Sequence, residues 1–214
     1  MSLSKSASLL TAGGFLSFFV FGFIDNLKGP ILPELLRAER LSYSQGGTIL
    51  LAVYFGFVIA TLLTGIMADV VGNRGVLLFA GICLCIGLGG VGIANSFELW
   101  MLLLGVVGLG LGAIEVGANG LMVELHPRSR GRYLNLLAAF HGAGSLLVPL
   151  YAAWLITLAF SWQSIYVTAA APALLLTAIF LVTKREGKEK ASGRKRPTAP
   201  CLRFAPRRVG ADVR

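Results

Sequence analysis

Six long apolar segments occupy almost all of the first 183 residues, and they constrain the fold more than any other feature of the sequence. Each is close to the ~20 mostly apolar residues that a transmembrane helix needs. The connections between them are too short to hold a soluble domain. We therefore predict an all-α, polytopic membrane protein with six transmembrane helices, over about Leu9–Leu32, Thr48–Ala68, Gly75–Ala94, Leu99–Val123, Leu134–Phe160 and Ile165–Thr183.

The composition favours a membrane protein over a protein that binds nucleic acid. Only 14% of the residues are charged, whereas a soluble domain carries about 25%. The net charge is +9, but residues 184–214 hold eleven Lys/Arg against three acids, which is +8 and leaves +1 for the remainder. Such a tail is typical of contact with anionic lipid or of topology control. We expect a transmembrane bundle over residues 1–183, a disordered cytoplasmic tail over residues 184–214, membrane lipid as a partner, and no nucleic acid.

No pattern in the sequence is typical of an enzyme. Cys83 and Cys85 are two residues apart on an apolar helix, where they point to different faces, and Cys201 lies in the tail. The sequence shows no metal-ligand cluster, no nucleophile–base pair and no phosphate-binding loop. We therefore predict no metal, no cofactor and no enzymatic activity.

The distribution of Lys and Arg predicts the orientation in the membrane. With the N-terminus inside, the inner segments hold sixteen Lys/Arg, including Arg128, Arg130 and Arg132, and the outer loops hold three. Cytoplasmic loops carry the excess of basic residues. We expect both termini to be cytoplasmic, in a plasma (inner) membrane.

Two acidic residues interrupt apolar segments at matched positions. Asp25 and Glu115 are ninety residues apart, and each ends a Gly-x-Ile-acid frame. An acid inside the bilayer costs at least about 2.5 kcal/mol and is functional by default. We therefore take both as candidates for proton coupling, because burial raises the pKa of a carboxyl group toward neutral pH.

The same ninety-residue offset relates the first three apolar segments to the last three. Related segments would cross the membrane in opposite directions, which predicts a three-plus-three inverted repeat, an architecture found in many secondary transporters. In the fourth segment, Gly108, Gly112, Glu115 and Asn119 share one helix face. Small residues permit close helix packing, so this face is predicted to point inward.

The connection between the second and third segments contains a second signal. Gly65, Asp69, Gly72 and Arg74 are spaced so that Asp69 ends one helix, Gly72 permits a reversal, and Arg74 lies at the water interface. The alternative is an ordinary polar turn. This connection resembles the signature loop of the major facilitator superfamily, Gly-x-x-x-Asp-basic-x-Gly-basic-basic. The resemblance implies a conformational-switch loop, although Val70 and Asn73 replace two of the basic residues.

A narrower resemblance is to the fucose–galactose–glucose proton symporter family. It rests on the glycine-rich run ending in Glu115 and Ala118-Asn119, on Leu134-Asn135 and Phe140-His141, and on Asp25-Asn26-Leu27 with Leu32-Pro33. The resemblance implies that Glu115 couples proton movement to sugar and that Asn119 and Asn26 lie near the sugar path. This chain has Asp25 at a family asparagine position, Gly29 near the family's helix 1 acid, and His141 at a family asparagine position.

We expect Asn26, Asn119, Asn135 and His141 to bind the substrate, since amides supply the donor and acceptor that hydroxyl groups require. Structural alternatives remain open for each kind of residue. Asn135 would otherwise cap or bridge helix ends, and His141 would be a neutral packing group. Asp25 would face an outer vestibule, and Glu115 would belong to a buried pair that holds helices together.

The superfamily fold that the resemblance implies has two six-helix bundles, and these six segments correspond to the N-terminal one. We expect a transporter, with a sugar and a proton as substrates, that works by alternating access. Three explanations for the single bundle stay open: a truncated product, a half-size protein that forms a homodimer, or a chain that pairs with a separately encoded second half. The rival interpretation is a membrane protein without transport activity of its own that regulates a full-length transporter.

Overall fold

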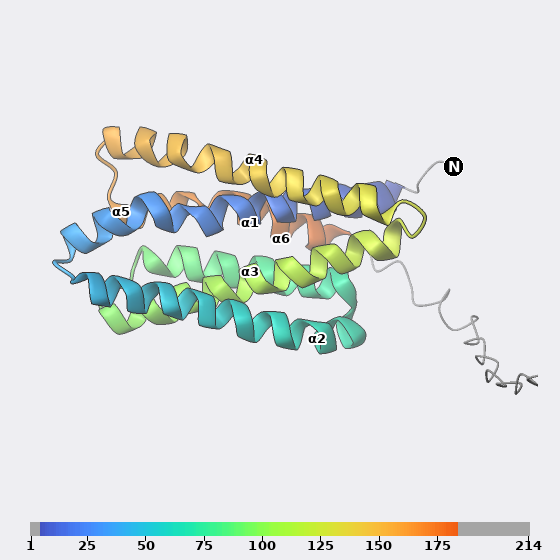
Figure 1. The fold of residues 1–214 in the computed structure, drawn as a ribbon, viewed down its shortest axis with the longest axis horizontal. Helices are drawn as coiled ribbons and strands as arrows, with labels where there is room; N and C mark the ends of the chain where they lie inside the picture. Colours follow the sequence, from blue (N-terminus) through green and yellow to red (C-terminus); the bar gives the residue numbers. More distant parts are fainter. Residues whose placement is uncertain (1–4, 184–214) are drawn as a thin grey trace, which may run out of the picture. The chain divides into compact units, whose positions relative to one another are not determined.

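The computed structural model describes residues 5–183, and every regular element within them is a helix (Figure 1). Five helical stretches are long and apolar enough to cross a membrane, with the last two helices forming one of these stretches. The predictions for the tail over residues 184–214 lie outside the described residues. The helices are α1 (Lys5–Ala38), α2 (Tyr43–Val91), α3 (Phe97–Leu125), α4 (Arg130–Thr157), α5 (Trp162–Thr168) and α6 (Ala170–Val182). The prediction of an all-α polytopic membrane protein is confirmed.

The predicted count of six separate helices is not reproduced, because α2 joins two of the predicted segments. It runs for 49 residues, and only Gly72, with φ 78° and ψ 162°, has a non-helical conformation inside it. This region of backbone space is nearly exclusive to glycine. The ribbon turns back at this point (Figure 1). α2 is thus two helical segments, residues 43–71 and 73–91, that meet at a bend.

Glycines on two faces of α3 bring it close to both segments of α2. A Cβ atom added at Gly108 would collide with the carbonyl oxygen of Val53 in the first segment. On another face, a Cβ at Gly110 would lie 2.9 Å from the carbonyl oxygen of Ala80 in the second segment. Since backbones this close leave no room for a side chain, the glycine content of α3 is explained by its place between the two segments.

α1 and α4 approach each other equally closely along their middles, and they lie side by side in Figure 1. A Cβ at Gly22 would collide with the carbonyl oxygen of His141, and one at Gly144 would collide with that of Phe19. Ser145 adds a polar contact, because its single hydroxyl hydrogen is shared between the carbonyl oxygen of His141 on its own helix, at 3.0 Å, and that of Gly22 on α1, at 3.3 Å. The contact between these helices therefore depends on a glycine from each.

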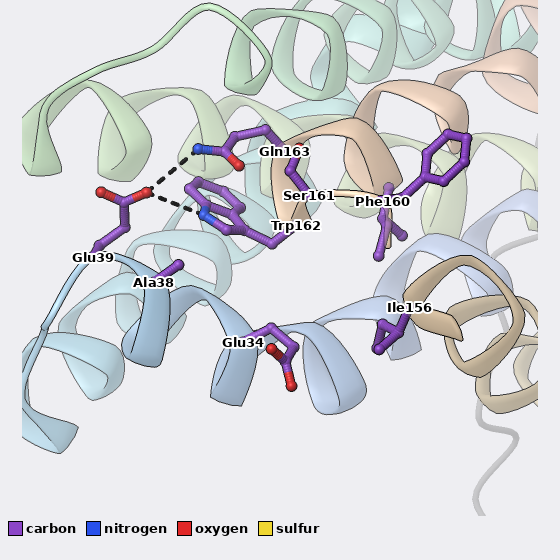
Figure 2. Close-up of a pocket in the computed structure, with 9 residues that line it drawn as sticks. Glu34, Ala38, Glu39, Ile156, Phe160, Ser161, Trp162 and Gln163 are labelled. Carbon is purple, nitrogen blue, oxygen red and sulfur yellow. Dashed lines mark hydrogen bonds between the residues drawn. The ribbon is translucent and has the colours of Figure 1, made fainter. Parts of the chain in front are cut away.

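Polar contacts connect the helices at both ends of the bundle. At the end with the α3–α4 connection, His126 Nε2 lies 2.9 Å from Thr11 Oγ1 of α1. At the opposite end, Glu39 Oε1 accepts hydrogen bonds from Trp162 Nε1 at 3.1 Å and from Gln163 Nε2 at 3.3 Å (Figure 2). Thr11 near the start of α1 and Glu39 just after its end thus connect this helix to other elements at the two ends of the bundle.

Local sequence explains where several helices begin. Ser42 caps α2 in a capping box with Gln45, and the side chains of Ser96 and Ser161 accept hydrogen bonds from backbone N–H groups at the starts of α3 and α5. The predicted end of the first segment at Leu32 is too early, because α1 continues through Pro33 to Ala38. The helix contains both Pro30 and Pro33, although each lacks the N–H group that would donate to the carbonyl oxygen four residues earlier.

Candidate functional site

Glu115 and Asn119, one turn apart on α3, form the polar part of that helix. Both side chains are half-buried. Asn119 Nδ2 donates to the backbone oxygen of Glu115 at 2.7 Å and to its carboxylate Oε1 at 3.3 Å. The structure thus brings together the two residues that were predicted to share a face, and the amide holds the carboxylate by a direct hydrogen bond.

His141 of α4 lies between this carboxylate and a cluster of aromatic rings on α1. Its imidazole is close enough for an electrostatic interaction with Glu115. Its ring packs edge-on against Phe21, with centroids 4.8 Å apart, and more distantly against Phe18 at 6.5 Å. Both phenylalanines are buried. His141 is therefore packed against α1 and lies within electrostatic range of Glu115.

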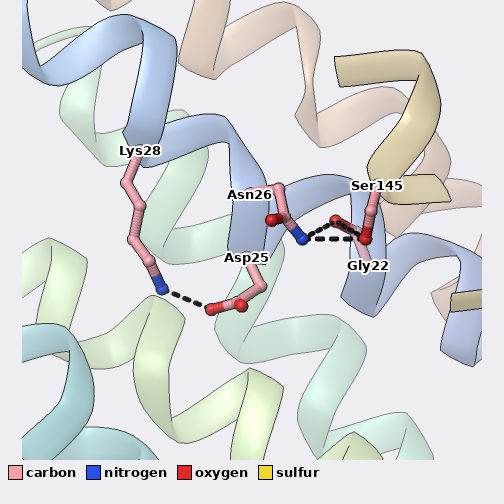
Figure 3. A network of polar contacts seen from close by, with 5 residues as sticks. All are labelled: Gly22, Asp25, Asn26, Lys28 and Ser145. Carbon is pink, nitrogen blue, oxygen red and sulfur yellow. Dashed lines mark hydrogen bonds and ion pairs between the residues drawn. The ribbon is translucent and has the colours of Figure 1, made fainter. Parts of the chain in front are cut away.

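Asp25 is in a different environment, because a lysine that the sequence reasoning did not consider pairs with it. Lys28 Nζ forms an ion pair with Asp25 Oδ1 one turn along α1 (Figure 3). The same ammonium lies 4.3 Å from the centroid of the Tyr54 ring on α2, within the range of a cation–π contact. Asp25 is thus a paired acid, whereas Glu115 is hydrogen-bonded to Asn119 and lies within electrostatic range of His141.

Asn26 lies on the side of α1 that faces α4. Its Nδ2 donates to the carbonyl oxygen of Gly22 at 2.9 Å and to Ser145 Oγ at 2.8 Å (Figure 3). Ser145 in turn donates to the carbonyl oxygen of His141 at 3.0 Å. The Asn26 amide therefore belongs to a polar contact between α1 and α4, and the Asn26 residue is still exposed.

Asn135 is not brought together with the other predicted residues. It is exposed near the start of α4, and its side chain makes no hydrogen bond with another residue in the range 5–183. Among the predicted substrate-binding residues, the structure groups Asn119 with His141 and Glu115, and Asn26 with Ser145.

The predicted switch loop lies at the bend of α2. Gly72 supplies the reversal, and Arg74 Nη2 donates to the carbonyl oxygen of Leu181 near the end of α6 at 3.3 Å. Asp69 and Gly65 are exposed before the bend. A hydrogen bond to α3 is made by Asn73, one of the two residues that depart from the family pattern: its Nδ2 donates to Glu124 Oε2 at 3.0 Å.

A pocket of about 220 Å³ lies at the end of the bundle where α1 meets α5 (Figure 2). None of the predicted site residues lines it. Its polar groups include Glu39, whose carboxylate accepts hydrogen bonds from both Trp162 and Gln163. We therefore place the candidate site at Glu115 and His141, on the inner faces of α3 and α4, and not in this pocket.

Three residues near the candidate site were missed by the sequence reasoning: Lys28, Tyr54 and Ser145. Lys28 gave a signal, since it follows Asp25 by three positions and such residues are neighbours on a helix. Tyr54 and Ser145 gave none, because their contacts depend on how α2 and α4 lie against α1. Within residues 5–183 no group of three or more His, Cys, Asp or Glu is placed to hold a metal ion.

The fold and these residues define a class of protein: a helical membrane protein with ionisable and amide groups placed within apolar helices. Such groups in transmembrane segments typically mark substrate or ion pathways. The profile of the Major Facilitator Superfamily matches residues 14–210, and the chain belongs to this superfamily, whose members are transporters rather than enzymes.

Curated relatives include sugar transporters. The L-fucose-proton symporter of Escherichia coli (strain K12) is 29% identical over 143 residues, which cover 63% of this chain and 32% of that protein. The glucose/galactose transporter of Brucella abortus biovar 1 is 28% identical over 174 residues, which cover 78% of this chain and 42% of that protein. The chain thus spans less than half the length of these two relatives.

Solved structures show the same fold. A structure of the proton:xylose symporter XylE matches with a TM-score of 0.73 at 18% identity, covering 84% of this chain and 45% of that one. A structure of the fucose:proton symporter of Escherichia coli matches with a TM-score of 0.61 at 22% identity, covering 84% and 48%. The predicted resemblance to the superfamily and to its sugar symporters is therefore confirmed.

Proposed function

We propose that this chain contributes one six-helix half of a proton-coupled transporter for a hexose- or fucose-like sugar that works by alternating access. Glu115 is the first candidate for the group that takes up and releases the proton, and Asp25 is the second. Asn26, Asn119, Asn135 and His141 are the candidates for contact with sugar hydroxyl groups. The loop of Gly65, Asp69, Gly72 and Arg74 is the candidate conformational switch.

The proposed topology has six membrane crossings. α2 would cross twice, because its 49 residues would extend about 74 Å as a straight helix, more than twice the ~30 Å of a hydrocarbon core. α5 and α6 together form one crossing. Six crossings support the three-plus-three inverted repeat, with both termini in the cytoplasm and the bundle in the plasma membrane.

The observation that carries the proposal is the environment of Glu115. Its carboxylate is half-buried in an apolar span and contacts an amide that also has donor and acceptor capacity for a hydroxyl group. His141 acts on the same carboxylate from α4. A change in protonation at Glu115 would switch it between hydrogen-bond donor and acceptor, which is how a proton would alter both sugar binding and the charge of the site.

The test is the uptake of labelled L-fucose, D-galactose, D-glucose and D-xylose into proteoliposomes that contain the purified chain, measured with and without an inward proton gradient. We expect accumulation that requires the gradient. In Glu115→Gln, gradient-driven accumulation should fall at least ~100-fold, as is typical for the loss of an essential proton-transfer group. The exposed Glu98 in the first turn of the same helix provides the control, and Glu98→Gln should transport normally.

The chain spans 32% of the fucose symporter and 42% of the glucose/galactose transporter, and a second candidate function is that of a membrane protein without transport activity of its own. A single six-helix half would act through a partner, either a second copy of itself or a separate half, or would regulate a full-length transporter. Absence of uptake by the purified chain, together with stable binding to such a partner, would favour this function.

A further inference from the structure

A buried histidine at the end of α3 has no part in the proposed function. The His126 side chain is only 7% exposed. Its Nε2 lies 2.9 Å from Thr11 Oγ1 on α1. Thr11 uses its hydroxyl hydrogen to donate to the carbonyl oxygen of Ala7 at 2.8 Å, so its oxygen accepts from the histidine. The hydrogen-bond network therefore assigns the Nε2–H tautomer to His126.

The other contact of the His126 ring is with α4. The ring stacks on Tyr133 with centroids 3.6 Å apart and planes 3° from parallel. His126 also ends α3, with its backbone N–H donating to the carbonyl oxygen of Met122 at 2.9 Å. One imidazole ring thus connects α1, α3 and α4 at a single end of the bundle. We call the set of Thr11, His126 and Tyr133 the histidine latch.

The surroundings of the ring favour its neutral form. From α1 it meets the neutral hydroxyl of Thr11, and from α4 the phenol ring of Tyr133. The nearest basic groups in the sequence are Arg128 in the connection and Arg130 and Arg132 at the start of α4, all exposed. The nearest acid in the sequence, Glu124 of α3, is exposed and hydrogen-bonded to Asn73. Burial lowers the pKa of the His126 imidazole, because the charged ring would lose its hydration.

We propose that the histidine latch is a proton-sensitive device that holds the ends of α1, α3 and α4 together and releases them at acid pH. A proton taken from water by Nδ1 leaves a charged ring that is buried against Thr11 and Tyr133 and away from bulk solvent. Hydrating that charge requires the ring to turn outward, which breaks both the Thr11 bond and the Tyr133 stack. The ring would then no longer connect the three helices.

The direction of the pH dependence follows from the lowered pKa. A histidine whose pKa is lower in the folded state contributes stability that is complete above its unfolded value, about 6.5. That contribution is lost as the pH falls through the folded value. The latch should therefore be closed at neutral pH and open progressively in mildly acidic solution. It is separate from Glu115 and would operate whether or not the chain moves sugar.

The full chain in lipid nanodiscs, with its histidines labelled with ¹⁵N, tests the proposal directly. The sequence has two histidines, so the signals that remain in the His141→Gln variant are those of His126. We expect the Nε2–H tautomer at neutral pH and a titration midpoint below the ordinary value of free histidine. A midpoint at or above that value would overturn the proposal.

A distance measurement then tests the release. Spin labels at the exposed residues Ser8 on α1 and Arg130 on α4, with the native cysteines changed to serine, report the separation of the two helix ends. The distance should lengthen over the pH range in which His126 titrates, and it should do so in His141→Gln as well. A distance that stays constant through the titration would contradict the proposal.

Two variants make the test independent of one mutant's folding. His126→Phe keeps a ring to stack on Tyr133 but cannot titrate, so its label distance should be independent of pH. Tyr133→Leu removes the stacked ring and admits water, so the transition should shift toward the ordinary histidine value. A transition retained in His126→Phe, or one left unshifted in Tyr133→Leu, would show that another group controls the distance.

Discussion

At the scale of single residues, the two acids within the apolar helices are in different chemical situations. Lys28 neutralises Asp25 from the next turn of α1, and the pair is half-buried, with side-chain exposures of 18% for Lys28 and 30% for Asp25. Glu115 instead accepts a hydrogen bond from the amide of Asn119 and has His141 within electrostatic range. Equal positions in a repeated sequence frame thus have different partners, because the residues one turn further along each helix, Lys28 and Asn119, lie outside the repeated four-residue frame.

The Asp25–Lys28 pair gives a prediction for stability. Asp25→Asn leaves the half-buried ammonium without its counter-ion and should lower the free energy of unfolding by about 1–3 kcal/mol, between the costs for exposed and buried pairs. Thermal denaturation of the purified chain in detergent measures the change. Adding Lys28→Met to Asp25→Asn should restore most of the stability, because it removes the unpaired charge.

The pair of Glu34 and Arg37, which has the same spacing on the same helix, is the matched control. Arg37 is 76% exposed, so Glu34→Gln should change the stability by less than about 1 kcal/mol. If Asp25→Asn and Glu34→Gln lower the free energy of unfolding equally, the partial burial of the Asp25–Lys28 pair has no energetic consequence.

At the scale of elements, glycine positions decide which helices meet. α3 approaches both segments of α2 through different glycine faces, and α1 meets α4 at Gly22 and Gly144. The sequence predicted a packing seam on α3 at Gly108 and Gly112, and the structure places the backbone of α2 against it. The bend at Gly72 turns one long helix into two segments, which the apolar pattern predicted as separate spans.

Gly144→Ala tests the contact between α1 and α4. The added methyl group would lie 2.9 Å from the backbone nitrogen of Phe23 and closer still to the carbonyl oxygen of Phe19. Because backbone atoms cannot move aside as a flexible side chain would, we expect a loss of about 1–3 kcal/mol in the free energy of unfolding, measured by thermal denaturation.

Gly142, two residues earlier on the same helix, serves as the control. A Cβ atom there meets no atom within 4 Å. Gly142→Ala should therefore be neutral or stabilise the helix by up to about 1 kcal/mol, since alanine has the higher helix propensity. Similar losses of unfolding free energy in Gly144→Ala and Gly142→Ala would mean that Gly144 is needed for a reason other than close packing.

At the scale of the whole molecule, the helices differ in how much of their apolar surface the bundle covers. In the most apolar window of each helix, 67% of α1 and 50% of α3 is buried, but only 28% of α2 and 22% of α4. α1 and α3 therefore form the interior of the described bundle. The outward apolar faces of α2 and α4 are available to lipid or to a partner.

The number of crossings makes a prediction for the whole chain. If α2 crosses the membrane twice, the connections before and after it lie on the same side. In intact cells expressing a variant without native cysteines, a membrane-impermeant thiol reagent should label Ser44→Cys and Asn95→Cys but not Arg128→Cys. All three positions are exposed in the structure. Labelling of Arg128→Cys and Ser44→Cys without Asn95→Cys would indicate that α2 crosses once.

Much of the architecture could be predicted from the sequence, because long apolar segments in a bilayer must form helices that satisfy their own backbone groups. The positions of Glu115, Asn119 and Gly72 could be predicted for the same reason, since each interrupts or ends such a segment. The contacts between the residues of the site could not be predicted in this way. Asn135 was expected with the other polar residues but lies apart from them, and the parts played by Ser145 and Tyr54 are visible only when α1 is packed between α4 and α2.

The sequence by itself thus determined the class of protein, its apolar spans and the acids within them, because hydrophobicity and its period act along the chain. Only the tertiary structure decided which helix faces contain close glycine contacts and which three helices the His126 ring connects. These properties depend on distances between residues far apart in the sequence: Thr11 and His126 are 115 positions apart and make contact at 2.9 Å. No local pattern encodes such a distance, because it arises from the packing of whole helices.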